Sequence, residues 1–386
     1  MWVVTRSVKT VVTETRHTMT DQGLTYEGTG VNYAAMDPAK VNAQEIGRTT
    51  AGNLERHGYR EVTASRGESC YLIENDVHFL ALVIEGLGSK NLVTDVMWHL
   101  LGAFGYEKAA QDTVAMIVND MITLGALPMV VGQYLGLGSD RWLTNPARSG
   151  SLALGWADAC NQAGAVYGSG ETPTLRDIIY PTAADIAGAA MGIIQPKDRR
   201  IDPATIAEGD DIVLLGGTGV HANGLTLIRD LSDVVSFKEC LEDGRMFGEA
   251  VLDPTPIYVP VIAAVLDAGI RPHYAVNITG HGWRKLMRAE QPFAYVMTRV
   301  PDPQPIFSFI QHHGRISDRE MYGNYNMGAG FAIYVKSEDS ARVIELSQAC
   351  GIEAWVCGHI EKCDKNKKVV IEPIDLEYDE NTLSVR

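Results

Sequence analysis

A nearly continuous apolar run at residues 77–84 leads directly into a glycine turn at residues 85–90. Such a run predicts a buried strand, and the polar residues 74–76 before it make it the second arm of a hairpin. The turn begins with the carboxylate of Glu85 and ends with the ammonium of Lys90. Glycine lets a backbone approach a ligand closely, so the turn is a candidate phosphate site; a tight turn with solvated ends is the alternative.

The rest of the chain alternates between strand-like and helix-like segments. A charged, proline-bounded segment at residues 195–203 interrupts the alternation and predicts a linker. A second alternating half follows, with strands expected near residues 211–215, 329–335, 353–360 and 368–372. This pattern predicts a mixed α/β fold of two domains, residues 26–195 and 205–375, which meet at a shared cleft and follow a flexible tail at residues 1–25.

Composition excludes several classes of protein. The 386 residues include 33 basic and 48 acidic side chains, a net charge of −15, and no basic block offsets it locally. A nucleic-acid or anionic-membrane partner is therefore not expected. No apolar run approaches the roughly 20 residues of a membrane helix. The six cysteines form no repeated CxxC pair and predict reduced, mostly buried thiols in a cytoplasmic protein.

Apolar residues recur at helical spacing over residues 107–125 and predict a helix with one packed face. Asp120 lies about 120° from the centre of that face, so we expect it to face a ligand or water rather than the core. Mg²⁺ on a nucleotide needs only one or two protein carboxylates, and Glu85 with Asp120 satisfies that number. The alternative is an ordinary exposed helix acid. If Asp120 instead holds a ligand from an exposed position, it contributes little to folding, so we expect Asp120→Asn to lower turnover far more than stability.

Other glycine clusters offer further candidates. Glu171 and Thr172 follow a glycine-rich stretch and suit a ribose hydroxyl, a metal-bound water or a simple turn cap. The segment 217–222 fits G-x-G-x-x-A, but no convincing acid follows it, so His221 and Asn223 suit a single phosphate better than a dinucleotide. The turn at residues 277–282 could be only a tight connection. Neither G-x-S-x-G nor H-E-x-x-H occurs, which excludes serine hydrolase and zinc protease motifs.

Taken in order, these motifs resemble the aminoimidazole ribonucleotide synthetase family, also called phosphoribosylformylglycinamidine cyclo-ligase. The resemblance covers about nine-tenths of the chain, and its specificity lies in the ordered set. The segments that carry it are residues 26–32, 84–90, 118–120, 169–172, 221–229, 254–259, 277–282 and 326–330.

The resemblance implies a homodimer whose first domains pair their sheets, with ATP and substrate between the domains. It implies ATP-dependent ring closure of formylglycinamidine ribonucleotide to aminoimidazole ribonucleotide, ADP and phosphate, with Mg²⁺ and K⁺ as cofactors. The implied site residues are Glu85 and Asp120 for the metal; Gly86, Gly88, Ser89 and Lys90 for the phosphates; Asp120, Gly170, Glu171 and Thr172 for the nucleotide; and Lys90, His221 and Asn223 for catalysis.

Four positions depart from the family pattern. Glu27 replaces a lysine, Asn32 and Glu85 replace aspartates, and His281 replaces a glycine. Glutamate at position 85 keeps the charge of the metal site, whereas Glu27 reverses a charge near the phosphates. The alternatives are therefore another ATP-dependent phosphotransferase of the same superfamily, or a catalytically silent nucleotide-binding paralogue with a regulatory role.

Overall fold

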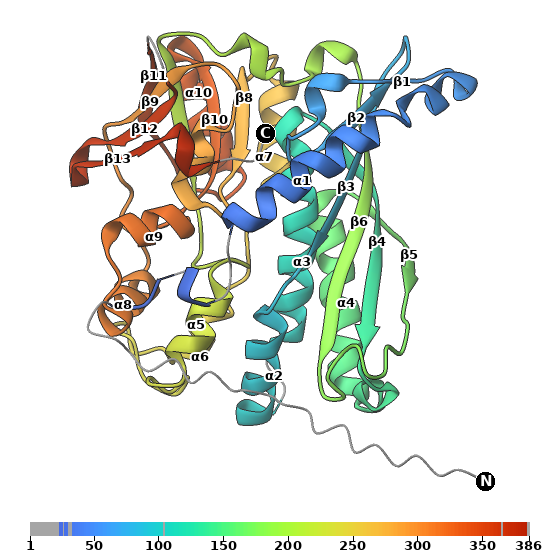
Figure 1. Ribbon diagram of the computed structural model, residues 1–386, viewed down its shortest axis with the longest axis vertical. Coiled ribbons are helices and arrows are strands. Elements are labelled where there is room, and N and C mark those ends of the chain that lie inside the picture. Colours follow the sequence, from blue (N-terminus) through green and yellow to red (C-terminus); the bar gives the residue numbers. More distant parts are fainter. Residues whose placement is uncertain (1–22, 26, 30–32, 103–104, 364–365, 384–386) are drawn as a thin grey trace.

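The computed structural model describes residues 23–25, 27–29, 33–102, 105–363 and 366–383. Two sheets, each with its own helices, form two halves that lie side by side (Figure 1). The mixed α/β class that the sequence predicts is confirmed. Of the residues in the predicted tail, 1–22 lie outside the described residues, and the amide of Leu24 donates to the Gly314 carbonyl at 2.9 Å.

The first half is built on a six-stranded sheet in the order β1-β2-β3-β6-β4-β5. The β4–β5 pair is parallel, and the other neighbours are antiparallel. Its strands are β1 Arg60–Glu61, β2 Tyr71–Glu74, β3 Phe79–Gly86, β4 Leu127–Leu137, β5 Val166–Glu171 and β6 Ala184–Ile194. Its helices are α1 Tyr33–Arg48, α2 Lys90–Leu101, α3 Tyr106–Met121 and α4 Pro146–Ala163.

Strand β3 is buried on one face only. Phe79, Ala81 and Val83 point into the core, whereas Leu82 and Ile84 on the opposite face are 47% and 72% exposed. The prediction of a fully buried strand is therefore wrong for the outer face of the sheet. The side chains on both faces of β3 are apolar, but helices cover only one of these faces. Helices α3 and α4 pack against the inner face and leave the outer face bare in the single chain.

The second half is built on a seven-stranded sheet in the order β13-β12-β9-β11-β7-β10-β8. Its strands are β7 Asp210–Gly216, β8 Tyr274–Asn277, β9 Phe293–Met297, β10 Ala329–Lys336, β11 Ala354–Lys362, β12 Lys368–Ile371 and β13 Leu376–Asp379. Its helices are α5 Leu225–Leu231, α6 Phe247–Val251, α7 Val259–Asp267, α8 Pro305–Gly314, α9 Asp318–Asn324 and α10 Ser337–Ala349. The strands predicted at the end of the chain are confirmed as β10, β11 and β12.

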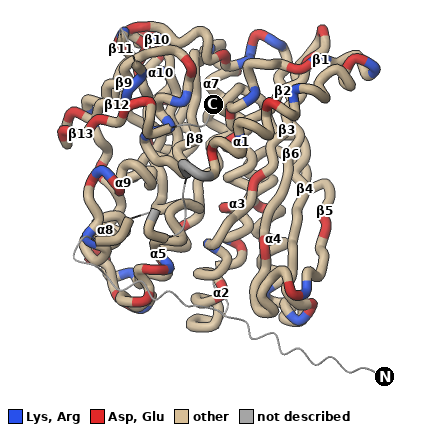
Figure 2. Tube along the Cα trace, viewed as in Figure 1, with Lys and Arg blue, Asp and Glu red and all other residues tan. Residues whose placement is uncertain are grey.

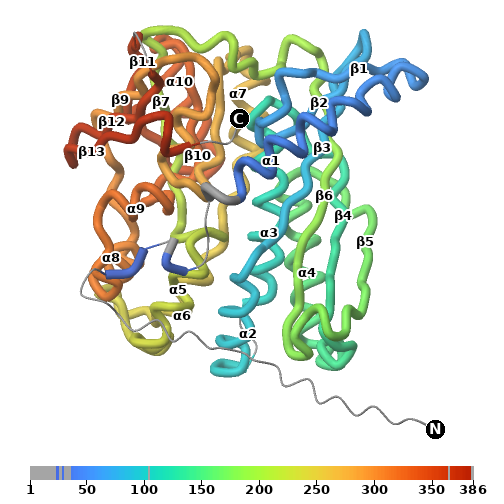
Figure 3. The backbone as a smooth tube through the Cα atoms, in the orientation of Figure 1, coloured from blue at the N-terminus to red at the C-terminus, as the bar shows by residue number. Residues whose placement is uncertain are grey.

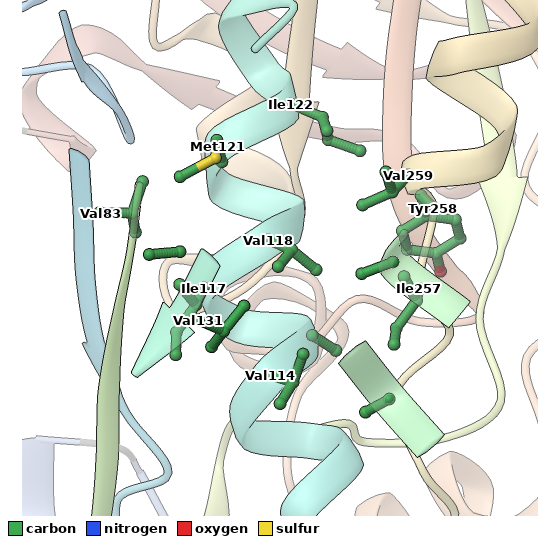
Figure 4. Packing of buried hydrophobic residues seen from close by; sticks show 14 of the residues in the cluster. Val83, Val114, Ile117, Val118, Met121, Ile122, Val131, Ile257, Tyr258 and Val259 are labelled. Atoms are coloured by element: carbon green, nitrogen blue, oxygen red, sulfur yellow. The ribbon is translucent and has the colours of Figure 1, made fainter. Parts of the chain in front are cut away.

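Helix α3 lies between the two halves and is packed from both sides (Figure 4). One side of the helix meets Val83 and Val131 of the first sheet, and the other meets Ile257 and Val259 at the start of α7. The apolar core is therefore continuous from one half to the other. We call the contact between α3 with its neighbours and residues 253–288 of the second half the seam.

Helix α1 lies against both halves (Figure 3). Its Gln44 carbonyl accepts from Arg66 of the first half, and its Asp37 lies near His281 of the second.

Acidic and basic positions are interspersed along the described chain rather than gathered in one basic segment (Figure 2). Among the described helices, none combines the length and apolar composition of a membrane span. All six cysteines are free thiols, but only Cys70, Cys160 and Cys357 are buried.

A buried ion pair stabilises the seam. Lys90 Nζ lies 2.6 Å from Asp112 Oδ2, and both side chains are fully buried. Asp112 also accepts from the Thr255 amide at 2.9 Å, so one carboxylate connects α3, α2 and the second half. Removing it leaves a buried ammonium without a counter-charge, which costs far more than the loss of a surface charge.

We therefore expect Asp112→Ala to lower the free energy of unfolding by about 3–5 kcal/mol. The matched control is Asp158→Ala, which removes an exposed acid from α4 and should change stability by less than about 0.5 kcal/mol. Urea unfolding followed by circular dichroism measures both variants. Equal losses in the two variants would contradict a special role for the seam pair.

Candidate active site at the seam

The Asn119-Asp120 pair at the end of α3 holds two loops of the second half. Asn119 donates to the Pro256 carbonyl and accepts from the Tyr258 amide, each at 2.9 Å. Asp120 accepts from the side chain of Asn277 at 2.7 Å. Because both side chains reach across the seam, the residues 254–259 and 277–282 are fixed against the end of the helix.

Asp120 is only 6% exposed, so it is not a solvated helix acid; it faces the polar side chain of Asn277 instead. Its helical angle is as expected, but the second half covers the face on which it lies. The premise that Asp120→Asn would leave stability nearly unchanged therefore fails, because the substitution alters a buried hydrogen bond to Asn277.

The carboxylates of Glu85 and Asp120 lie within each other's electrostatic reach. Burial and the negative charge of Asp120 raise the pKa of Glu85 to about 7. Lys285 of the second half lies near both acids, and burial lowers its pKa to about 8 although the charge of Asp120 opposes that shift. Two carboxylates and one ammonium therefore lie close together at the seam. Their charges interact strongly because little water screens them there.

This pair of acids suits a cation that brings further ligands of its own. No group of three or more metal-ligating His, Cys, Asp or Glu side chains occurs among the described residues. The described residues therefore do not form a metal site made only of protein ligands. Mg²⁺ bound together with a nucleotide needs only one or two protein carboxylates, because phosphate oxygens and water supply the other ligands. Burial, and then the charge of Asp120, raise the pKa of Glu85, and a bound cation would favour the ionised form that both effects disfavour.

The glycine turn lies directly beside this pair. Gly86 and Gly88 are exposed, and Gly88 adopts a φ of +67° with open space around it. Ser89 is the N-cap of α2 but makes no side-chain capping bond. The Leu87 amide donates to the Ile186 carbonyl at 2.8 Å and the Leu92 amide to the Ser89 carbonyl at 3.1 Å, so the amides of this turn that suit an anion are those of Gly88 and Ser89.

Lys90, in contrast, points away from this turn into the seam. Its ammonium donates to the carbonyls of His221 at 2.8 Å and Asp253 at 3.1 Å, and it pairs with Asp112. An ammonium has three donors, and these partners account for all of them. The structure therefore does not support phosphate binding or catalysis by Lys90. The sequence pattern identified the lysine but could not predict the direction in which its side chain points.

His221 lies beside the seam, where its carbonyl accepts from Lys90 at 2.8 Å. Its ring is 1% exposed and accepts from the Thr218 amide through Nε2 at 3.3 Å. Burial, and then the charge of Lys90, lower its pKa to about 3, so the ring stays neutral. A catalytic base at His221 is not supported. Asn223 differs, because its side-chain nitrogen is buried and has no hydrogen-bond partner among the described residues, and it remains a candidate ligand-binding group.

Gly170, Glu171 and Thr172 lie at the exposed end of edge strand β5. Glu171 shares a row of the sheet with Gly86 through Tyr134 and Ala187. Three strand spacings separate the two backbones, which is about 14 Å. The single chain therefore does not bring Glu171 against the carboxylate pair, and its predicted role in nucleotide binding remains a prediction.

Three residues of the seam were not predicted from the sequence, namely Asp37, Asp112 and Lys285. Asp112 and Asn119 are seven residues apart and therefore share one helix face, so this spacing was an available signal for a second buried side of α3. Asp37 and Lys285 carried no such signal. Their place depends on how α1 and the 277–288 segment pack across the seam, which no local pattern encodes.

Comparison with solved structures identifies the fold as that of two-domain, AIR-synthase-like proteins. A Thermotoga maritima PurL structure complexed with AMPPCP aligns at a TM-score of 0.53 and 16% identity over 84% of this chain, and this chain spans about half of its length, 48%. The HypE–HypF complex aligns at a TM-score of 0.57 and 12% identity over 81% of this chain and 92% of the other. At these identities the likeness establishes the fold.

Sequence comparison establishes the family. The N-terminal domain of AIR synthase related proteins matches residues 69–194, and the C-terminal domain matches residues 207–371. Phosphoribosylformylglycinamidine cyclo-ligase of Methanocaldococcus jannaschii is 33% identical over 75% of this chain and 80% of its own. The Methanococcus maripaludis C7 protein of the same name is 31% identical over 92% and 97%. The chain belongs to the AIR synthase family and is an enzyme of the ligase class.

The raised pKa of Glu85 makes stability depend on pH. The folded protein keeps a proton up to about pH 7 that the unfolded chain releases near its ordinary pKa of 4.5. The free energy of unfolding therefore falls as the pH rises between these values and levels off above pH 7. Glu85→Gln has no such proton to lose.

We expect Glu85→Gln to match the wild type in stability near pH 4.5 and to exceed it at pH 8 by about 1–3 kcal/mol. Urea unfolding at several pH values checks this. A stability difference that stays constant across the range would mean that Glu85 keeps an ordinary pKa.

Proposed function

We propose that the protein is a phosphoribosylformylglycinamidine cyclo-ligase that uses ATP to close the imidazole ring of formylglycinamidine ribonucleotide. The observation that carries the proposal is the meeting of Glu85 and Asp120 beside the open glycine turn at the start of α2. The names of the relatives support the reaction, and the complex of PurL with AMPPCP supports nucleotide binding by this fold.

In this proposal each group of the site has a distinct task. Glu85 and Asp120 would hold Mg²⁺, which would neutralise phosphate charge, and the amides of Gly88 and Ser89 would bind the phosphates. Asn223, whose side-chain nitrogen lacks a partner among the described residues, would donate to the substrate. The formyl amide oxygen is phosphorylated, and an amidine nitrogen then displaces phosphate. Placement and charge neutralisation, rather than a protein nucleophile, drive such a transfer.

We also propose the domain bounds 26–195 and 205–375, and a cytoplasmic location, in agreement with six free thiols. We propose a homodimer as well, which the bare outer face of the first sheet supports. Leu82 on β3 lies beside Met191 on β6, which is 46% exposed, and Ile84 is the most exposed apolar side chain of this face. A hollow of about 510 Å³ lined by Ile84, Tyr134 and Ala189 lies on the same face. A second copy would cover these groups.

The function is tested by ADP release with purified protein, Mg²⁺ and K⁺. We expect release that depends on formylglycinamidine ribonucleotide, and Glu85→Gln should lower kcat by about 100-fold, the scale for loss of one charge-stabilising group. Asp158→Asn, which changes an exposed acid on α4 and lies outside the outer sheet face, should leave kcat unchanged. Tight nucleotide binding without any turnover would instead favour a regulatory paralogue.

The dimer is tested by sedimentation velocity. Ile84→Lys places a charge on the outer sheet face and should convert the dimer to a monomer, because burying an unpaired ammonium is costly. Leu154→Lys is the matched control, since Leu154 is 68% exposed on α4 and lies outside that face. A wild type that sediments as a monomer would contradict the proposed pairing.

A further inference from the structure

The carboxylate of Asp37 on α1 is buried without a hydrogen bond at one of its oxygens. Its side chain is 3% exposed, and Oδ1 has no hydrogen-bond partner among the described residues. The cation nearest to Oδ1 is Lys40 Nζ at 3.7 Å, which is beyond hydrogen-bond length, and the Lys40 side chain is 53% exposed. A buried carboxylate in this state is costly unless another group donates to it.

The second neighbour of this carboxylate is His281. Its Nε2 lies 3.7 Å from Asp37 Oδ2, and the residue is 6% exposed. Burial and the charges of Lys285 and Arg284 lower the pKa of His281 to about 2, so the ring is neutral. His281 therefore flanks Asp37 but supplies no positive charge to it.

The backbone at His281 is unusual as well. It has a φ of +70°, a left-handed conformation that glycine adopts freely and other residues adopt at a cost. A glycine stands on either side of it in the sequence. Glycine would form this turn at lower cost, yet the chain has a histidine whose buried ring lies against a buried carboxylate. We therefore infer a role for the imidazole side chain.

This pair lies next to the proposed catalytic centre. The 277–282 segment connects the two places, because its Asn277 donates to Asp120 at 2.7 Å and its His281 lies 3.7 Å from Asp37. A substrate whose formyl oxygen lies at Glu85 and Asp120 would direct its neighbouring amidine toward Asp37. An ionised carboxylate accepts hydrogen bonds only, which excludes a phosphate there and requires a group rich in N–H donors.

We propose that Asp37, flanked by His281, binds the amidine of the substrate. This inference rests on the proposed function, whose substrate carries an amidine. Two adjacent amidine nitrogens present parallel donors to the two oxygens of a carboxylate, the geometry that makes guanidinium–carboxylate pairs strong. Adenine suits the place less well, because an acceptor nitrogen adjoins its amino group. Asp37 is thus a specificity-determining residue, and His281 is a positioning residue for it.

The test compares the two KM values of Asp37→Asn. Loss of a charge-assisted hydrogen bond should raise KM for formylglycinamidine ribonucleotide by about 10- to 100-fold, while KM for ATP stays within about twofold of the wild type. The melting temperature should not fall, because the variant removes a buried charge that lacks a full set of partners. Glu45→Gln, an exposed acid on the same helix, is the matched control and should leave both constants unchanged.

His281→Gly tests the positioning role, because glycine tolerates the left-handed backbone and should keep or raise the melting temperature. It should raise KM for the substrate, and the double variant with Asp37→Asn should be no worse than Asp37→Asn alone. Additive effects in the double variant would contradict the coupling. An unchanged substrate KM in Asp37→Asn, or a rise confined to ATP, would overturn the assignment of Asp37.

Calorimetric titration with formylglycinamidine ribonucleotide separates this inference from the proposed function. A wild type that binds the compound without closing its ring contradicts the function alone. Asp37→Asn binding as tightly as the wild type contradicts the inference alone. A wild type that does not bind the compound contradicts both.

Discussion

The burial of α3 from both sides is the constraint on which the rest of the structure depends. Its apolar residues join the cores of the two halves, and its polar residues Asp112, Asn119 and Asp120 all reach across the seam. A polar group in such a place is stable only with a partner, so each one fixes a loop of the second half. The helix thereby holds loops from distant parts of the chain in one place.

The site arises where this constraint meets the end of β3. Glu85 leaves the sheet on the side of α3, and Lys285 arrives from the second half, so opposite charges gather with little water between them. Lys90 and His221, although they belong to the same glycine-rich motifs, help to hold the seam together. The open backbone of the 86–89 turn and the acids beside it are what remain available to a nucleotide.

Local patterns predicted what depends on neighbours in sequence. The hairpin before residue 85, the helix over 107–125 and the strands of the second half follow from periodicity and turns, and the ordered motifs identified the family. The direction of Lys90 and the burial of Asp120 could not be predicted, because each depends on packing between halves. The bare outer face of β3 was missed for the opposite reason, since its apolar sequence resembles that of a strand covered on both sides.

The most direct test of the central claim is the position of a divalent cation bound together with a nucleotide. Crystals grown with Mn²⁺ and a non-hydrolysable ATP analogue allow the metal to be located by anomalous scattering. The account predicts one peak within about 2.0–2.3 Å of carboxylate oxygens from both Glu85 and Asp120, the distance range for small divalent cations. A nucleotide-bound peak that contacts neither carboxylate would contradict it.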